Sequence, residues 1–294
     1  MKGKGSFSTS VKNLILVKNQ GSYATRSAQI KTMQQAAKIL SANGLKVLSA
    51  QSLKPKHVSA IIDSWKKSKN SERTIANKVS HLRQFTKMIG KPNIISPTNA
   101  ELGLKVGLQR HSETSKASDG KNIGSVGGKS ANAPYYQASL GLAREFGLRR
   151  EEAMKIVPTI ADKGDHIALR GSWCKGGRPR TVEVRTENQR SALNAAKAVS
   201  RGRSLISPQK SYKSHSAAFG SACKRAGIKA HALRHHYAQS RYFEITGKKP
   251  PALGGKSKAQ MTKDERFEDS QARIEISNEL GHGREDVTNA YLGN

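Results

Sequence analysis

Four short segments in the second half of the chain carry the side chains best suited to chemistry. They offer guanidinium and ammonium cations, imidazole rings and a phenol, without the spacing of a zinc site. A guanidinium presents a planar fork of donors that matches the oxygens of a phosphate and stays charged near neutral pH. The segments are Gly147-Leu148-Arg149-Arg150-Glu151-Glu152, the turn around Lys175, His231-Ala232-Leu233-Arg234-His235, and Leu280-Gly281-His282 followed by Tyr291.

These segments need secondary structure to position them, and the surrounding hydrophobic pattern predicts helices and one β-hairpin. Alternating apolar residues predict strands over 166–173 and 180–185, with Lys175 in the turn between them. Helical patterns occupy the remainder, over 136–156, 192–199, 217–226, 232–243 and 274–291. The predicted fold class is mainly α with a small β-sheet (α+β).

The first hundred residues predict a small and strongly basic helical domain. They hold 18 Lys and Arg against only Asp63 and Glu72, in a chain whose formal net charge is +31. Apolar residues recur at helical spacing, with Pro55 suited to the first turn of one helix and Ser71 to the N-cap of another. Because such a charge repels itself unless a polyanion lies nearby, nucleic acid is the first candidate partner.

Other functional classes find little support in the sequence. The best apolar run near the N-terminus, Leu14-Ile15-Leu16-Val17, is far too short to span a bilayer. Cys174 and Cys223 are the only cysteines, which excludes a disulfide framework and favours a reducing cytoplasm. The stretch 124–130 is similar to a phosphate-binding loop, but its glycines enclose three residues where four are needed.

Taken in order, the four segments resemble the catalytic boxes of the tyrosine recombinases, the integrase family of site-specific DNA recombinases. The family pattern is an arginine in Gly-Leu-Arg-x-x-Glu, a lysine in a β-hairpin, His-x-x-Arg, then His or Trp, then Tyr. The matching positions are Arg149, Lys175, His231, Arg234, His282 and Tyr291. The Gly-Leu-Arg-x-x-Glu frame selects Arg149 over Arg150, and Lys175 is preferred to Lys163.

The resemblance assigns these residues roles at a scissile phosphate. Arg149 and Arg234 would clamp the phosphate and stabilise the charge that develops on its oxygens. The same cations would favour the ionised phenol of Tyr291, the nucleophile. Lys175 would protonate the departing 5′ oxygen as general acid.

The remaining site residues would assist this reaction. His231 and His282 would donate to phosphate oxygens or accept the phenol proton. Glu152 shares a helical face with Arg149 and would orient the cluster without itself doing chemistry. No cofactor and no metal is expected, since the covalent link retains the energy of the phosphodiester.

The resemblance also divides the chain into parts. Residues 1–112 would form a core-binding DNA domain, 113–133 a Gly/Ser-rich linker, and 134–294 the catalytic domain, with a charged insertion at about 245–270. Because only Leu292-Gly293-Asn294 follow Tyr291, contacts between protomers are expected from other parts of the chain.

The function implied is cleavage and rejoining of DNA through a 3′-phosphotyrosyl intermediate, for integration or excision of a mobile element. Double-stranded DNA would be the partner, bound by a homotetramer with accessory DNA-bending or directionality proteins and no membrane. The protein would be bacterial, phage or plasmid-encoded, cytoplasmic and associated with the nucleoid. The alternatives are a type IB-like topoisomerase, a telomere resolvase, or a non-catalytic DNA-binding protein on the same scaffold.

Overall fold

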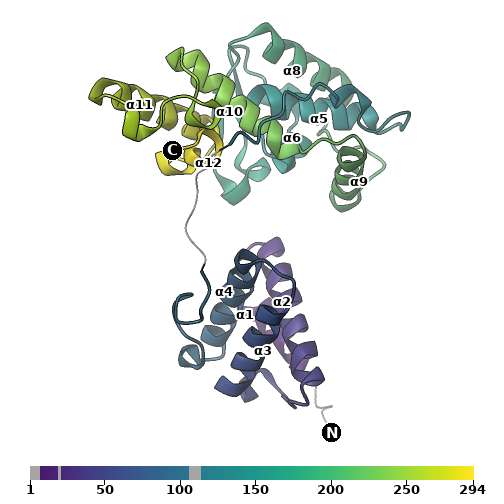
Figure 1. The fold of residues 1–294 in the computed structure, drawn as a ribbon. Helices are drawn as coiled ribbons and strands as arrows, with labels where there is room; N and C mark the ends of the chain where they lie inside the picture. The colour runs from purple at the N-terminus through teal and green to yellow at the C-terminus, as the bar shows by residue number, and fades with distance from the viewer. Residues whose placement is uncertain (1–6, 19–20, 106–113) are drawn as a thin grey trace. The chain divides into compact units, whose positions relative to one another are not determined.

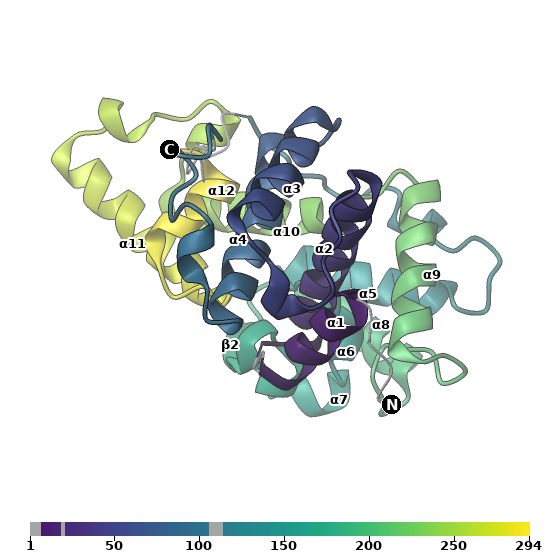
Figure 2. The ribbon, with the colours of Figure 1, turned by 90° about the horizontal axis from the view of Figure 1, so that it is seen from below.

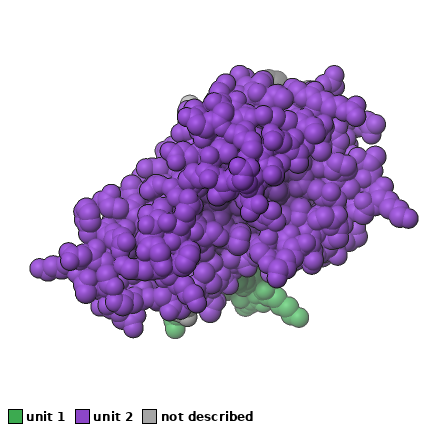
Figure 3. Space-filling model, turned by 90° about the horizontal axis from the view of Figure 1, so that it is seen from above, with its two compact units in different colours: residues 1–108 green, residues 109–294 purple. Residues whose placement is uncertain are grey.

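The computed structural model describes residues 7–18, 21–105 and 114–294. The chain divides into two units, residues 1–108 and 109–294, coloured separately in Figure 3. The boundary expected between residues 112 and 113 lies outside the described residues. Each unit has its own apolar core. No helix in the described ranges is long and apolar enough to cross a membrane.

The first unit packs its helices around one apolar core (Figures 1 and 2). Pro55 begins one helix and Ser71 caps another, its Oγ accepting from the Thr74 backbone N–H at 3.3 Å, both as predicted. The unit also contains a helix over 7–18, in which Phe7, Val11 and Ile15 are buried. The elements are α1 (Phe7–Lys18), α2 (Tyr23–Ala42), η1 (Ala50–Ser52), α3 (Pro55–Lys67), α4 (Glu72–Met88) and η2 (Pro92–Ile94).

The second unit sets its helices beside a two-stranded antiparallel hairpin, which confirms the predicted fold class. Helix α5 packs against α8 and α10 in its core. The α-helices and strands are α5 (Ala133–Phe146), α6 (Arg150–Lys155), α7 (Pro158–Ala161), β1 (His166–Leu169), β2 (Arg180–Glu183), α8 (Glu187–Ser200), α9 (Tyr212–Arg225), α10 (Ala230–Thr246), α11 (Lys263–Glu279) and α12 (Asn289–Leu292). Short 3₁₀ turns are η3 (Ile123–Ser125), η4 (Gly171–Trp173), η5 (Lys175–Gly177), η6 (Pro251–Leu253), η7 (Lys258–Gln260) and η8 (Glu285–Thr288).

The hairpin strands are shorter than the predicted ranges 166–173 and 180–185. The chain leaves β1 through a close approach at Gly171, where an added Cβ would lie 2.5 Å from the carbonyl oxygen of Gly177. Gly177 itself has φ of +70°, a left-handed conformation that favours glycine. The connection therefore closes through η4 and η5 instead of continuing as extended strands.

The segment expected to be a linker, 113–133, differs from that expectation over its described part. Val126 is fully buried in the core of the second unit. The backbone N–H of Ser118 donates to the Ala232 carbonyl at 3.1 Å. Residues 114–132 thus belong to the second unit, and their small polar side chains suit close turns there.

The segment expected to be a charged insertion, 245–270, comprises the end of α10, the turns η6 and η7, and the first half of α11. Ion pairs tie its loop to α11, with Lys248 2.5 Å from Glu268 and Lys256 2.7 Å from Glu265. These pairs are partly exposed, so solvent screens them and each contributes little to stability.

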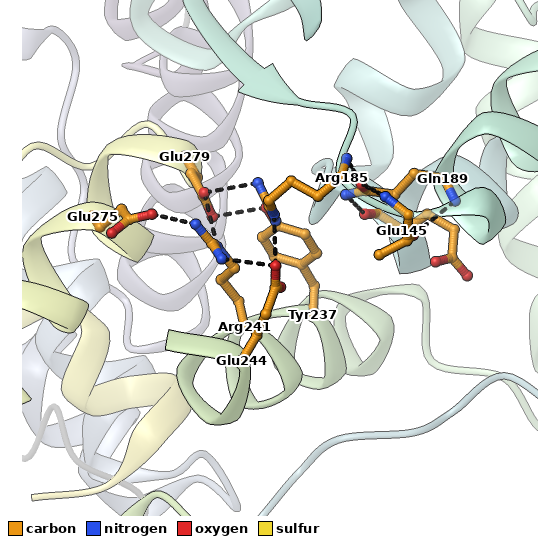
Figure 4. A network of polar contacts seen from close by, with 9 residues as sticks. Glu145, Arg185, Gln189, Tyr237, Arg241, Glu244, Glu275 and Glu279 are labelled. Atoms are coloured by element: carbon orange, nitrogen blue, oxygen red, sulfur yellow. Dashed lines mark hydrogen bonds and ion pairs between the residues drawn. The ribbon is translucent and has the colours of Figure 1, made fainter. Parts of the chain in front are cut away.

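A buried carboxylate, Glu279, joins three parts of the second unit (Figure 4). It accepts hydrogen bonds from the Tyr237 hydroxyl at 2.7 Å, from Arg185 Nη1 at 3.1 Å and from Arg241 Nε at 3.1 Å. Tyr237 and Arg241 lie on α10, whereas Arg185 follows β2. The carboxylate therefore fixes the end of α11 against both α10 and the hairpin.

Removing the charge of Glu279 should destabilise the second unit, because the guanidinium groups of Arg185 and Arg241 would keep only the more exposed carboxylates of Glu244 and Glu275 as counter-charges. We expect Glu279→Gln to lower the free energy of unfolding by about 3 kcal/mol. The matched control is Glu244→Gln, since Glu244 pairs with the same two arginines but its side chain is 43% exposed. The free energy of unfolding of Glu244→Gln should fall by less than about 1 kcal/mol.

The measurement is urea unfolding followed by Trp173 fluorescence in a Trp65→Phe background, so that only the second unit is reported. Equal losses for the two variants would show that Glu279 does not have this role.

Candidate active site

The turn between α5 and α6 places Arg149. Helix α5 ends at Gly147, whose φ is +61° and where an added Cβ would lie 2.5 Å from the Tyr237 ring. Only glycine fits both the conformation and the contact. Two residues later Arg149 begins α6 as its N-cap, with Glu152 one turn along. The tight turn thereby brings the side chains of Arg149 and Glu152 into contact with each other.

The guanidinium of Arg234, on α10, is the centre of the site and is fully buried. Its Nη1 donates to the Gly147 carbonyl and its Nη2 to the Leu280 carbonyl at 2.6 Å. Its Nε lies 3.1 Å from the hydroxyl of Tyr291. Burial lowers the pKa of Arg234 to about 10, although the nearby Tyr291 opposes that shift. The group therefore stays cationic at neutral pH.

His282 and Tyr291 meet at this cation. The Nε2 atom of His282 lies 3.1 Å from Arg234 Nη2, 3.4 Å from Arg149 Nη2 and 3.3 Å from the Tyr291 hydroxyl. Burial, followed by the charges of Arg234 and Arg149, lowers the pKa of His282 to about 4. The structure thus brings together four predicted residues, Arg149, Arg234, His282 and Tyr291.

Glu152 supports this cluster as a fully buried carboxylate. It accepts from the backbone N–H of Arg149 at 2.9 Å and from Arg149 Nη1 at 2.8 Å. A second guanidinium, Arg180, lies 2.7 Å away on its other side. Burial alone would raise the pKa of Glu152, but the hydrogen bonds and charge of Arg180 and Arg149 outweigh it and lower the pKa to about 2. Glu152 is therefore ionised and holds Arg149.

Two further imidazoles of α10 lie against the ring of Tyr291. The His231 ring centroid is 5.8 Å from that of Tyr291, and the His235 centroid is 4.8 Å from it. Burial and the charges of Arg234 and Arg149 lower the pKa of His231. Burial and the neighbouring His231 lower that of His235 to about 4. His231 thus sits beside the phenol as predicted, and both rings favour the neutral form.

Lys175 is placed differently from the other predicted residues. It lies in η5 at the exposed turn of the hairpin. In the part of the chain that the structure describes, its ammonium forms no hydrogen bond with His282 or Tyr291, whose side-chain hydrogen bonds are with Arg149, Arg234 and each other. Its predicted role depends on a substrate that reaches the hairpin.

The backbone around Tyr291 is held by side chains that the motifs do not include. The Gln239 amide donates to the Tyr291 carbonyl at 2.8 Å. Arg273 Nη1 donates to the Asn289 side chain at 2.9 Å and to the Gly293 carbonyl at 3.0 Å. Arg180 and Arg273 are both buried cations, so the missed residues are those whose role is to hold other residues in place.

One signal for Arg180 was available in the sequence. Residues two apart on a strand lie on the same face, and Val182 is an apolar residue of the predicted strand 180–185. Arg180 therefore had to lie on the buried side of the hairpin. For Gln239 and Arg273 no comparable pattern exists.

The described ranges contain no group of three or more His, Cys, Asp or Glu side chains that could hold a metal ion. Both cysteines, Cys174 and Cys223, have free thiols. The arrangement instead presents cationic donors and neutral imidazoles around one phenol, which suits an anionic substrate attacked by that phenol.

Comparison with known structures identifies the fold. A lambda integrase dimer bound to a COC' core site is 14% identical, with a TM-score of 0.62 over 95% of this chain and 92% of that chain. The XerH site-specific recombinase bound to difH substrate is 13% identical, with a TM-score of 0.58 over 97% of this chain and 80% of that one. The Tn1549 transposon integrase in complex with transposon right end DNA is 14% identical, with a TM-score of 0.54 over 98% and 95%.

Sequence comparison covers both units. No curated protein sequence matches the chain. The family profile described as "Phage integrase, N-terminal" matches residues 5–95, and the profile described as "Integrase" matches residues 110–240. The profiles do not extend over residues 241–294, which hold His282 and Tyr291. With most of the chain matched and the fold shared, the chain belongs to the phage-type integrases of the tyrosine recombinase family.

Proposed function

We propose that this chain is a site-specific DNA recombinase that cleaves and rejoins double-stranded DNA through a 3′-phosphotyrosyl intermediate on Tyr291. One observation carries the proposal: Arg234 and His282 both contact the Tyr291 hydroxyl, at 3.1 and 3.3 Å. Buried phenols usually have hydrogen-bond partners. What distinguishes Tyr291 is that its partners are a guanidinium and an imidazole, and that Arg149 lies 3.4 Å from that imidazole. Its position beside donors that match a phosphate supports the role of nucleophile.

The hydrogen bonds of His282 define its protonation state. Arginine can only donate, so Nε2 of His282 must be the acceptor when Arg149 and Arg234 both face it. The neutral ring then carries its proton on Nδ1, in agreement with the lowered pKa. Once Arg149 and Arg234 turn to a phosphate, the lone pair of this neutral Nε2 is free to take the phenol proton as Tyr291 attacks.

In the cleavage step, one bond to phosphorus replaces another and two protons move. The Tyr291 oxygen forms a bond to phosphorus while the bond from phosphorus to the 5′ oxygen breaks. The phenol proton passes to His282, and Lys175 gives a proton to the departing 5′ oxygen. Arg149 and Arg234 turn their free donors to the non-bridging oxygens, where negative charge develops. Attack by the 5′ hydroxyl of another strand reverses these bonds and rejoins the backbone.

The proposed partner is DNA, with affinity supplied largely by phosphate contacts. The first unit presents exposed lysines along and beside α3, at positions 54, 56, 66, 67 and 69. The lambda integrase relative is described as a tetramer bound to a Holliday junction. We extend that arrangement to this chain, with accessory DNA-bending or directionality proteins and with integration or excision of a mobile element as the task.

Replacing the nucleophile should abolish covalent capture of DNA. We expect Tyr291→Phe to bind a nicked suicide substrate as tightly as the parent but to form no covalent adduct, since only the attacking oxygen is lost. Denaturing gel electrophoresis measures the adduct. Tyr212→Phe, a partly exposed tyrosine of α9, is the control and should react normally. An adduct formed by Tyr291→Phe would contradict the assignment.

Lys175 should accelerate cleavage only when the leaving group is an oxygen that needs a proton. We expect Lys175→Ala to slow cleavage about 10²–10⁴-fold on ordinary DNA. The loss should largely vanish on DNA with a bridging 5′ sulfur at the scissile position, because a thiolate leaves without protonation. Lys163→Ala, the control, should match the parent on both substrates. A Lys175→Ala defect of equal size on the sulfur substrate would exclude Lys175 as general acid.

The lowered pKa values of His235 and His282 predict a loss of stability in acid. In the folded protein both titrate near 4, whereas an unfolded chain takes up these protons near 6.5. The free energy of unfolding should therefore fall as the pH drops from about 6.5 to 4. In the double variant His235→Gln/His282→Gln this fall should be smaller, as measured by urea unfolding at several pH values. An unchanged slope would show that these rings are not held neutral.

A further inference from the structure

Arg180 is a buried cation of the site with no role in the proposed chemistry. It is the first residue of β2, opposite Leu169 in the hairpin, and its side chain is 7% exposed. Its Nη2 donates to Glu152 Oε2 at 2.7 Å and its Nη1 to Glu152 Oε1 at 3.3 Å. Its Nε donates to the Glu279 carbonyl at 2.6 Å, and Nη1 also lies 3.5 Å from the Cys174 sulfur. Its forked pair with Glu152 and its bond to the Glu279 carbonyl therefore commit this guanidinium to partners within the protein.

The two arginines share one carboxylate unequally. Arg180 takes both oxygens of Glu152 in the forked geometry that gives the strongest pairing. Arg149 gives that carboxylate only its Nη1 and its backbone N–H. The Nη2 of Arg149 consequently faces His282 at 3.4 Å instead of Glu152. That nitrogen is the donor a phosphate beside Tyr291 would meet.

Arg180 also supports the turn that carries His282. A Cβ added at Gly281 would lie 3.0 Å from Arg180 Cδ, so the arginine stem packs directly beneath this glycine. The Glu279 carbonyl that Arg180 binds is two residues earlier. Arg234 binds the next carbonyl, that of Leu280, at 2.6 Å. The two arginines thereby hold successive carbonyls at the end of α11.

We propose that Arg180 is a positioning residue that saturates Glu152 and so keeps one edge of Arg149 free for the scissile phosphate. Without Arg180, a buried and ionised carboxylate would have two unfilled acceptor sites. The nearest remaining cation, Arg149, would turn to fill them and withdraw its Nη2 from the site. This inference rests on the proposed function, because it concerns the phosphate that Tyr291 would attack.

A double-mutant cycle tests the competition for Glu152. Arg180→Met should slow adduct formation in a single turnover by roughly 10-fold to 100-fold, the scale of a misplaced reacting group, with unchanged DNA affinity. Adding Glu152→Gln removes the negative charge that draws Arg149 away. The double variant should therefore cleave faster than Arg180→Met alone. If Arg180 had a purely structural role, the double variant would cleave more slowly than Arg180→Met, because the destabilising effects of two buried substitutions add together.

Controls separate this effect from loss of charge or of folding. Arg170→Met removes an exposed arginine of the same hairpin, one stacked on Trp173, and should cleave like the parent. Arg180→Lys keeps the positive charge but cannot bind both oxygens of Glu152 at once, so its rate of adduct formation should stay well below that of the parent. Normal cleavage by Arg180→Met, or a double variant as slow as the product of the two single defects, overturns the proposal.

A crystal structure of Arg180→Met without DNA tests the same inference independently of activity. Arg149 should then give both terminal nitrogens to Glu152 and leave His282. An Arg149 that keeps its original contacts overturns the inference, whatever the reaction catalysed. If instead the parent protein forms no adduct while Arg149 moves as expected, the proposed function fails and the positioning role of Arg180 stands.

Discussion

The site depends on one buried cation, the guanidinium of Arg234. Taking such a charge out of water costs several kcal/mol unless other groups compensate it. Among the described residues no carboxylate forms an ion pair with it, and its partners are two carbonyls, a phenol and an imidazole. The free protein therefore carries an unbalanced positive charge in its interior. An anionic phosphate beside Tyr291 would supply the missing counter-charge. The positive charge of Arg234 would therefore favour both the binding of the phosphate and its cleavage.

The surrounding structure keeps that cation in place. Gly147 and Leu280 supply the carbonyls, and they come from the α5–α6 turn and the end of α11. Glu279 then fixes α11 against α10, which itself carries Arg234 (Figure 4). The result is a closed ring of contacts in which each element holds the next. Such a preorganised site needs little reorganisation when charge develops on a substrate.

The sequence predicted the reacting groups better than the groups that hold them. Arg149, Arg234, His282 and Tyr291 sit in short motifs whose spacing is local, and the structure brings them together. Arg273 and Gln239 act through backbone carbonyls distant in sequence, so no local sequence pattern predicts their role. The hairpin was predicted too long because its ends depend on a contact between Gly171 and Gly177. Contacts of this kind appear only when the chain is folded.

The most direct measurement is the identity of the residue that becomes linked to DNA. After trapping on a suicide substrate, nuclease and trypsin digestion should leave a nucleotide on a single peptide, which mass spectrometry can sequence. We expect the modification on Tyr291, within the peptide 285–294 that follows Arg284. A nucleotide found on any other residue, such as Tyr237, would contradict it.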